Sequence, residues 1–224
     1  MTGRTPILHA DPIPYAGLGA APWRNGGGVT REVLRLPENA SAEASPEEFA
    51  ARISIADVDA SGPFSAYPGI DRIIMLVGGS SMRLTIDGRR AELLPLHPFA
   101  FAGDASTLGE IDSPTRDLNV MTCRGLATAT MTVVHGGPRQ VDVRTGEDAV
   151  IVGLPERGCV VALQDGSGGV EAEKPIELGD LDCLHLHGLG SATVRGEGAV
   201  ITVTRRGTPP GPTLRGGGAG PKLG

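Results

Sequence analysis

Hydrophobic and polar residues alternate along short stretches of the chain, and most of these stretches end at glycine, proline or aspartate. A period of two is typical of β-strands with one buried face. Clear alternation occurs in residues 52–58, 82–87 and 117–121, whereas residues 73–77 are apolar at every position and predict a central strand. Further strands are expected to begin near Val29 and to cover residues 128–135, 149–154, 159–163, 184–187 and 199–205.

The alternation also assigns side chains to faces. In the first stretch, Ile53 and Ile55 share one face, and the opposite face is polar or small: Arg52, Ser54 and Ala56. In residues 117–121, Leu118 and Val120 share one face, and the other carries Asp117, Asn119 and Met121. In residues 82–87, the apolar face consists of Met82, Leu84 and Ile86.

Turn residues separate these strands. Gly62-Pro63 and Pro68-Gly69 bracket the aromatic residues Phe64 and Tyr67. The stretch Gly78-Gly79-Ser80-Ser81 predicts a hairpin between residues 73–77 and 82–87, and Asp87-Gly88 predicts a second hairpin. Residues 136–148 are interpreted as a linker with a short edge strand, and Ser45-Pro46-Glu47-Glu48 as one capped helical turn.

Many short strands with glycine-rich turns predict an all-β barrel or sandwich. The pattern of residues 75–101 recurs at an offset of roughly 84 residues, which indicates two copies of one β module. We therefore expect an N-terminal arm (1–22), a first barrel with a pocket (23–135), a second half (136–206) and a disordered tail (207–224).

Composition narrows the class of protein. Among 224 residues, 34 glycines and 18 prolines exclude a helical bundle, and the net charge of −6 argues against a nucleic-acid surface. The cysteines Cys123, Cys159 and Cys183 have no metal-knuckle spacing and are expected to be buried free thiols. Without an apolar run long enough to span a bilayer or a signal-like N-terminus, we expect a cytoplasmic protein that binds no membrane.

The motifs of the first half resemble those of the HutD/Ves family. Trp23-Arg24-Asn25-Gly26-Gly27-Gly28, with Thr30 and Glu32, is similar to the first signature of that family. Later motifs match in the same order: Arg52–Ala56, Gly62–Ser65, Pro68–Arg72, Pro98–Asp104 and Asp117–Met121. The resemblance covers residues 15–205, and it is looser in the second half.

This resemblance implies a bicupin, in which two RmlC-like jelly-roll barrels share one chain, and a link to histidine utilisation. It also implies sensing or regulation through an anionic metabolite of the formiminoglutamate, formylglutamate or urocanate class. The sequence leaves open whether the chain is an enzyme and favours binding over turnover. A homodimer is compatible with the sequence.

Arginines within the motifs point to anion binding, because a guanidinium group matches a carboxylate in two parallel hydrogen bonds. The amides of Asn25 and Asn119 are suited to amide or formimino groups, and the aromatic residues, all at or before position 101, can line a pocket. The candidate ligand-binding residues are Arg24, Asn25, Arg52, Ser54, Phe64, Arg72, Phe101, Asn119 and Met121. Alternatively, each arginine pairs with a nearby acid. For Trp23, the alternative to a pocket residue is a core plug, a side chain that fills the core between the N-terminal arm and the barrel.

Neither catalysis nor a metal site emerges from the sequence. His185-Leu186-His187 places two imidazoles on one face of a strand, but no third ligand follows in sequence, so we expect no metal and no cofactor. Catalytic residues stay unassigned, because no nucleophile motif is found and Glu32, Asp71, Asp104 and Asp117 are equally eligible acids. The competing hypotheses are a hydrolase or deiminase acting on a formimino or formyl group, and a protein-interaction module without ligand.

Overall fold

The computed structural model describes residues 8–37, 49–164 and 174–206, which form β-strands and one short 3-10 helix, η1 (Tyr15–Gly17). The first half contains a six-stranded sheet in the order β2 (Ala20–Pro22), β3 (Gly28–Leu36), β4 (Ala51–Val58), β11 (Thr115–Cys123), β6 (Ile70–Gly78) and β9 (Phe99–Ala102). A four-stranded sheet has the order β5 (Gly62–Pro63), β10 (Thr107–Glu110), β7 (Met82–Ile86) and β8 (Arg89–Leu93).

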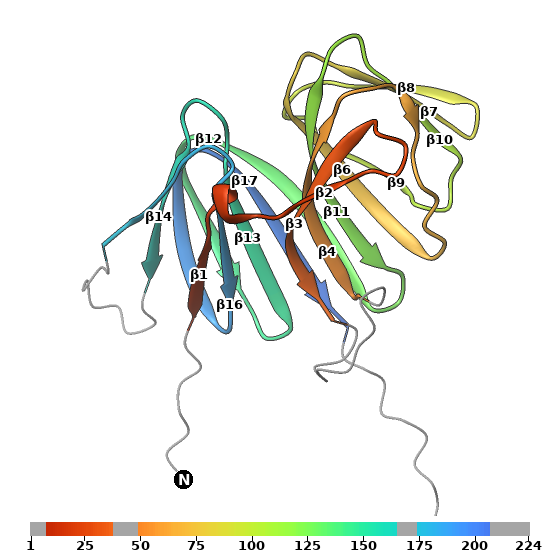
Figure 1. The fold of residues 1–224 in the computed structure, drawn as a ribbon. Helices are drawn as coiled ribbons and strands as arrows, with labels where there is room; N and C mark the ends of the chain where they lie inside the picture. The colour runs from red at the N-terminus through yellow and green to blue at the C-terminus, as the bar shows by residue number, and fades with distance from the viewer. Residues whose placement is uncertain (1–7, 38–48, 165–173, 207–224) are drawn as a thin grey trace, which may run out of the picture.

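The second half is a single seven-stranded sheet. Its main order is β1 (His9–Ile13), β16 (Cys183–His187), β13 (Glu147–Gly153), β17 (Gly190–Arg205), β14 (Cys159–Gln164) and β15 (Ile176–Leu178), and β12 (Ala127–Val143) also pairs with β17. Figure 1 shows the two halves side by side, with the four-stranded sheet on the side of the first half away from the second. The predicted all-β class is confirmed.

The suspected repeat is visible in the strand order. The run β4-β11-β6-β9 of the first half corresponds in position to β13-β17-β14-β15 of the second half. In both runs, a strand from late in the segment is inserted between two earlier ones, which is the kind of crossover found in Greek-key barrels. The two halves therefore share this part of their strand order.

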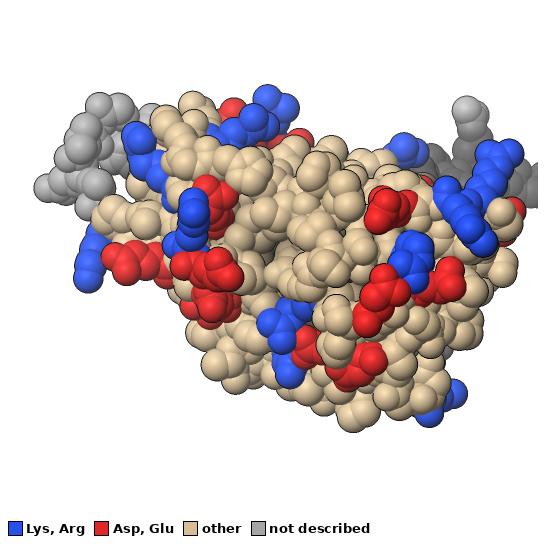
Figure 2. Space-filling view, turned by 90° about the horizontal axis from the view of Figure 1, so that it is seen from above, with Lys and Arg blue, Asp and Glu red and all other residues tan. Residues whose placement is uncertain are grey.

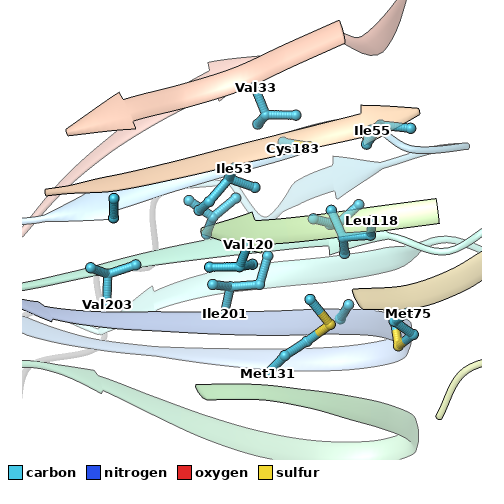
Figure 3. Packing of buried hydrophobic residues seen from close by; sticks show 14 of the residues in the cluster. Val33, Ile53, Ile55, Met75, Leu118, Val120, Met131, Cys183, Ile201 and Val203 are labelled. Carbon is cyan, nitrogen blue, oxygen red and sulfur yellow. The ribbon is translucent and has the colours of Figure 1, made fainter. Parts of the chain in front are cut away.

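One hydrophobic core joins the two halves. It contains Ile53, Ile55, Leu118 and Val120 from the first half and residues of β13, β16 and β17 from the second. Figure 3 shows these side chains between the two layers, with Met131, Ile201 and Val203 on one side and Val33 and Ile53 on the other. The predicted apolar faces of residues 52–58 and 117–121 are confirmed, since these faces build the shared core.

Each half also has a core of its own. In the first half, Ile74 and Leu76 of β6 pack against Met82 and Leu84 of β7 and Leu93 of β8. The second half has a separate cluster that includes Leu184, Leu186 and Val194. As predicted, Met82 and Leu84 are buried while Arg83 is exposed, and β6 is an internal strand between β11 and β9.

Two predictions about connections are wrong. Gly78–Ser81 does not close a hairpin, because β6 belongs to the six-stranded sheet and β7 to the four-stranded one. Residues 136–143 are not a linker, because β12 continues through them and pairs with β17 to Val143. In both cases local turn residues indicate a change of direction, but they do not reveal which strands become hydrogen-bonded partners.

Other turns follow the sequence signals. Asp87 and Gly88 both have positive φ, 47° and 78°, and they connect the paired strands β7 and β8, as predicted for an Asp-Gly hairpin. At Gly28, a side chain would collide with the carbonyl oxygen of Asp57 and contact the Trp23 ring at 3.2 Å. The third glycine of the motif thus permits the close packing of Trp23 against β3 and β4.

The structure adds detail to the expected N-terminal arm and to the expected domain boundary. Residues 9–13 form β1 at the edge of the second sheet, so part of the expected arm is integrated into the fold. The expected boundary after residue 135 falls within β12. The expected helical turn at residues 45–48, and the tail at 207–224, lie outside the described residues.

The surface carries charges of both signs. In Figure 2, Lys and Arg side chains lie among Asp and Glu side chains around an uncharged central area of the face. In the described ranges, no helix has the length and apolar character needed to cross a membrane.

Candidate functional site

The candidate site lies on the face of the six-stranded sheet that is turned away from the shared core. In the register of β4, β11 and β6, Ser54 pairs with Asn119, and Met121 lies between Arg52 and Arg72. Because neighbouring residues of a strand point to opposite faces, these side chains lie opposite Ile53, Leu118 and the other shared-core residues. They therefore face the interior of the first barrel.

Arg72 is the central group of this face. Its side chain is buried, with 5% relative exposure, and its guanidinium carbon lies 5.1 Å from the ring centre of Phe64 and 5.0 Å from that of Phe101. A third ring, Tyr67, lies at 6.0 Å. The Nε atom has no hydrogen-bond partner within the described part of the chain. Burial lowers the pKa of Arg72, and the charge of Asp117 opposes this effect.

Two further polar side chains of this face each have a buried oxygen atom without a partner. Asp117 and Asn119 are buried on the inner face of β11, and the Oδ1 atom of each accepts no hydrogen bond from the residues that the structure describes. Burial raises the pKa of Asp117 to about 7, although Arg72 acts in the opposite direction, and Asp57 adds to the increase. An unpaired buried polar atom costs free energy, so these groups are suited to a ligand that supplies donors and acceptors.

The neighbouring arginine, Arg52, is held by an acid. Its Nε donates to Glu32 at 2.7 Å, and the same carboxylate accepts from Arg35 at 2.7 and 3.0 Å. The hydrogen bond from Arg35 lowers the pKa of Glu32, Arg52 contributes in the same direction, and burial opposes both. Arg52 therefore pairs with a nearby acid, which is the alternative to ligand binding given above for the arginines.

Seven of the nine candidate residues occupy one region. Arg52, Ser54, Arg72, Asn119 and Met121 lie on the inner face of the six-stranded sheet, and the rings of Phe64 and Phe101 lie over Arg72. Arg24 and Asn25 are not part of this group. They lie in the exposed turn before β3, near the Val58 end of β4, roughly 20 Å along that strand from Arg52.

Asn25 and Trp23 have local roles in that turn. The Oδ1 atom of Asn25 accepts a hydrogen bond from the Gly27 amide at 3.0 Å. The indole Nε1 of Trp23 donates to Thr30 at 2.7 Å, and its ring packs against the core of the first barrel. These contacts match the core-plug interpretation of Trp23 and a turn-capping role for Asn25.

Some site residues escaped the sequence reasoning. Arg35 was not singled out, Tyr67 was named only among the aromatic residues suited to a pocket, and Asp117 was one of four equivalent acids. The alternation of residues 117–121 already places Asp117 on the same face as Asn119, and this pattern could have identified Asp117 as a site residue. Of the other acids, Asp71 and Asp104 both bind the exposed Arg124, and Asp104 also accepts from the Gly69 amide at 2.6 Å, so they stabilise a turn.

Hydrocarbon side chains pack inside the first barrel alongside the polar groups of the candidate site. Leu84 and Phe101 face its interior, but Met75 points into the shared core instead. Two open surface grooves lie elsewhere. One, of about 430 Å³, is lined by residues that include Asp57, Thr115 and Arg116. The other, of about 420 Å³, is lined by Arg83, Thr85, Arg90, Ala91, Glu92 and Glu110. Arg83 is already paired there with both carboxylate oxygens of Asp112 at 2.8 Å, so the buried, unpaired groups around Arg72 form the stronger candidate.

The two buried cysteines, Cys159 and Cys183, are unsuited to nucleophilic chemistry. All three cysteines are free, and Cys159 and Cys183 are buried. Burial raises the pKa of Cys159 to about 11 and that of Cys183 to about 12, with a smaller contribution from Asp182 to the latter. Thiols with such pKa values hold their protons near neutral pH and are weak nucleophiles.

The sheets and the paired cores define an all-β protein of the cupin type. Two solved structures share this fold at low identity: YlbA of E. coli (9% identity, TM-score 0.60, covering 89% of this chain and 90% of that one) and an oxalate decarboxylase mutant of Bacillus subtilis (7%, 0.57, 87% and 76%). The particular family is HutD, which matches residues 16–202, and the chain belongs to it. This family is associated with histidine utilisation.

Similar proteins agree with this assignment. The structure of HutD from Pseudomonas fluorescens SBW25 in a formate condition has 31% identity and a TM-score of 0.73, covering 89% of this chain and all of that one. Protein Ves of Citrobacter koseri is 37% identical over 147 residues, 64% of this chain and 73% of that protein. An uncharacterized 21.2 kDa protein in the hutC 3′ region of Pseudomonas putida is 36% identical over 117 residues, 51% of this chain and 56% of that relative.

Proposed function

We propose that the first barrel binds a small, carboxylate-bearing metabolite of histidine breakdown and that the protein senses or modulates the pathway through it. The observation that carries this proposal is the buried guanidinium of Arg72, which has an unpartnered Nε and lies among three aromatic rings. Burying a charge without a partner is costly. A bound carboxylate would offset this cost with charge-assisted hydrogen bonds.

The neighbouring groups narrow the class of metabolite. Asn119 and Asp117 present oxygen atoms without donors, so they suit a ligand that carries N–H groups near its carboxylate. Formiminoglutamate has both features, formylglutamate has an amide N–H, and urocanate has an imidazole N–H. The association of the HutD family with histidine utilisation favours this set over other small acids.

The aromatic rings define how a ligand reaches the site. Phe64, Tyr67 and Phe101 are partly exposed, while the guanidinium beneath them is buried. Displacement of one ring would therefore open a path from solvent to Arg72. The displaced ring could then close over the apolar part of the ligand, as aromatic walls of binding pockets commonly do.

A second candidate function is favoured by Asp117. A carboxyl group with a pKa of about 7 can accept or donate a proton near neutral pH, which is the property of a general acid or base. In a hydrolase or deiminase acting on a formimino or formyl group, Asp117 would act as the general base that takes a proton from the attacking water. Binding without product formation supports the sensor, and turnover that is lost in Asp117→Asn supports the enzyme.

Titration calorimetry with formiminoglutamate, formylglutamate and urocanate tests the binding proposal. We expect at least one of them to bind the wild-type protein, and we expect Arg72→Gln to weaken that binding at least tenfold. Arg83→Gln is the matched control, because Arg83 is an exposed arginine of the same barrel that pairs with Asp112. Binding that survives Arg72→Gln, or the failure of all three compounds to bind, would overturn the proposal.

The proposed role in histidine breakdown also bears on the cellular location of the protein. We infer that the protein works in the cytoplasm, where metabolites of histidine breakdown are handled and where cysteines stay reduced. The three free cysteines support this location. Charges of both signs on the face in Figure 2 differ from the basic surface that a nucleic-acid backbone requires, which supports a small molecule as the partner.

A further inference from the structure

A second group of polar side chains lies at the edge of the seven-stranded sheet. Strand β1 runs antiparallel to β16, with Asp11 opposite His185 and His9 opposite His187. On β16, Leu184 and Leu186 point into the core of the second half, so the two histidines point to the opposite face. We call Asp11, His185 and His187 the His–Asp cluster.

The His–Asp cluster brings three potential metal ligands close together. Three potential ligand atoms, one from each residue, lie within 4.8 Å of one another. The Nε2 atom of His187 is 2.9 Å from Oδ2 of Asp11, and the ring centres of His185 and His187 are 4.9 Å apart. With metal–ligand bonds of about 2.1 Å, adjacent ligands lie roughly 3.0–3.4 Å apart. The side chains of the cluster, whose ligand atoms are spread over up to 4.8 Å, would therefore have to move closer together to bind one cation.

The surrounding residues hold these ligands in place. Nε2 of His185 lies 2.9 Å from Oδ1 of Asp148, whose buried carboxylate is also 3.0 Å from Nε of Arg205. When Nε2 donates its proton to Asp148, the lone pair of Nδ1 is free to bind a metal, which is the usual carboxylate–histidine support of such sites. The ring of His9 stacks on that of His187 at 5.1 Å and restricts its orientation.

Exposure increases across the cluster. The side-chain exposures of His185, His187 and Asp11 are 13%, 39% and 64%. One side of the cluster is therefore anchored in the sheet and the other is open to solvent. An ion could enter from that side and keep water molecules in its remaining coordination positions.

We propose that the His–Asp cluster binds one first-row divalent metal ion, such as Zn²⁺, and thereby fastens β1 to β16. Two imidazoles and a carboxylate are ligands that such ions prefer. The sequence pointed away from a metal because His185-Leu186-His187 offers two ligands only. The third, Asp11, precedes His187 by 176 residues and reaches it through the pairing of β1 with β16. The site is separate from the Arg72 region and independent of the proposed metabolite.

The test uses tag-free, full-length protein treated with chelator and then titrated with Zn²⁺ in a calorimeter. We expect one equivalent of Zn²⁺ to bind and to raise the melting temperature, because binding to the folded state alone stabilises it. Co²⁺ provides a second readout, since its visible absorption reports nitrogen and oxygen ligands directly.

Three variants decide whether the cluster is the site. His187→Gln should abolish Zn²⁺ binding, and Asp11→Asn should weaken it at least tenfold. His135→Gln is the matched control. His135 also bonds a carboxylate, that of Glu197 at 2.7 Å, but among the described residues it belongs to no group of three potential metal ligands. The control variant should bind Zn²⁺ like the wild type.

The proposal is wrong if the wild-type protein binds no Zn²⁺, or if either Asp11→Asn or His187→Gln binds it like the control. Should His187→Gln fail to fold, Asp11→Asn still decides the matter, because Asp11 is an exposed residue of an edge strand. In that variant, unchanged affinity contradicts the site.

Discussion

Arg72 and Asp117 place opposite formal charges inside one barrel without forming a close ion pair in the described structure. Burial lowers the pKa of Arg72 and raises that of Asp117, so both shifts favour the neutral forms. A buried pair that is not optimally bonded contributes little to stability. Such an arrangement is common at functional sites, where a ligand completes the interactions.

A pH titration of stability tests the state of Asp117. The carboxyl pKa is about 7 in the folded protein and 3.8 in its ordinary state, so between these values the folded form holds one extra proton. The free energy of unfolding should therefore fall as the pH rises from about 4 to about 7, by roughly 2–4 kcal/mol for this group. Asp117→Asn cannot titrate and should lack this component.

Urea unfolding of the wild type and of Asp117→Asn at several pH values between 4 and 8 measures this difference. The wild type should lose stability relative to the variant as the pH rises. Parallel curves for the two proteins would show that Asp117 ionises normally and would remove the argument for an unusual carboxyl group.

At the residue scale, the sequence predicted which side chains share a face but not what they contact. Alternation in residues 52–58 and 117–121 placed Ser54, Asn119 and Met121 together, as the register of β4 and β11 shows. It could not reveal that Glu32 holds Arg52, because that contact depends on how β3 pairs with β4. Asp11 was missed for the same reason, since its partners lie at the other end of the chain.

At the scale of elements, β10 determines the position of Phe64. Gly109 of β10 lies against the ring, and an added Cβ would come within 2.7 Å of its Cε1 atom. Gly109→Ala should therefore push Phe64 towards Arg72, lower stability by about 1–3 kcal/mol and weaken metabolite binding. Thermal unfolding and calorimetry measure the two effects.

Gly62→Ala is the control for this substitution. Gly62 lies on the neighbouring strand β5, where an added Cβ would meet only the Asn25 side chain at 3.8 Å. This variant should keep both its melting temperature and its affinity near those of the wild type. Equal affinity of Gly109→Ala and the wild type would mean that the position of Phe64 does not matter for binding.

The elements also show where sequence patterns reach their limit. The Asp87-Gly88 turn was predicted correctly because a two-residue hairpin depends on local backbone conformation. The Gly78–Ser81 turn was predicted wrongly because the chain there crosses from one sheet to another. A turn sequence does not contain that information, since the choice of partner depends on distant strands.

At the scale of the whole molecule, the shared core makes the two halves depend on each other. Ile201 of β17 is fully buried in that core, among residues of β4 and β11. Ile201→Ala should lower stability by about 2–5 kcal/mol. Because Trp23 is the only tryptophan and belongs to the first half, its fluorescence reports whether the loss extends across the core.

Denaturant unfolding followed by both Trp23 fluorescence and far-UV circular dichroism makes this comparison. We expect the two signals to shift together in Ile201→Ala, as in a single cooperative transition. A fluorescence transition that stays at the wild-type midpoint while the dichroism shifts would show that the halves unfold independently.

The all-β class could be predicted from the period of the pattern and from the turns, which are properties of each segment alone. The integration of β1 into the second sheet and the length of β12 could not, because both depend on pairing between distant segments. The pattern alone already suggested two related halves, and the family resemblance added the expectation of a bicupin.

The central claim is that Arg72 binds a carboxylate inside the first barrel. A crystal structure of the protein grown with formiminoglutamate tests it most directly. We predict a carboxylate group within about 3 Å of the Arg72 guanidinium, with a ligand N–H directed at Asn119 or Asp117. A ligand bound elsewhere, or an Arg72 side chain surrounded only by protein at saturating ligand, would contradict the account.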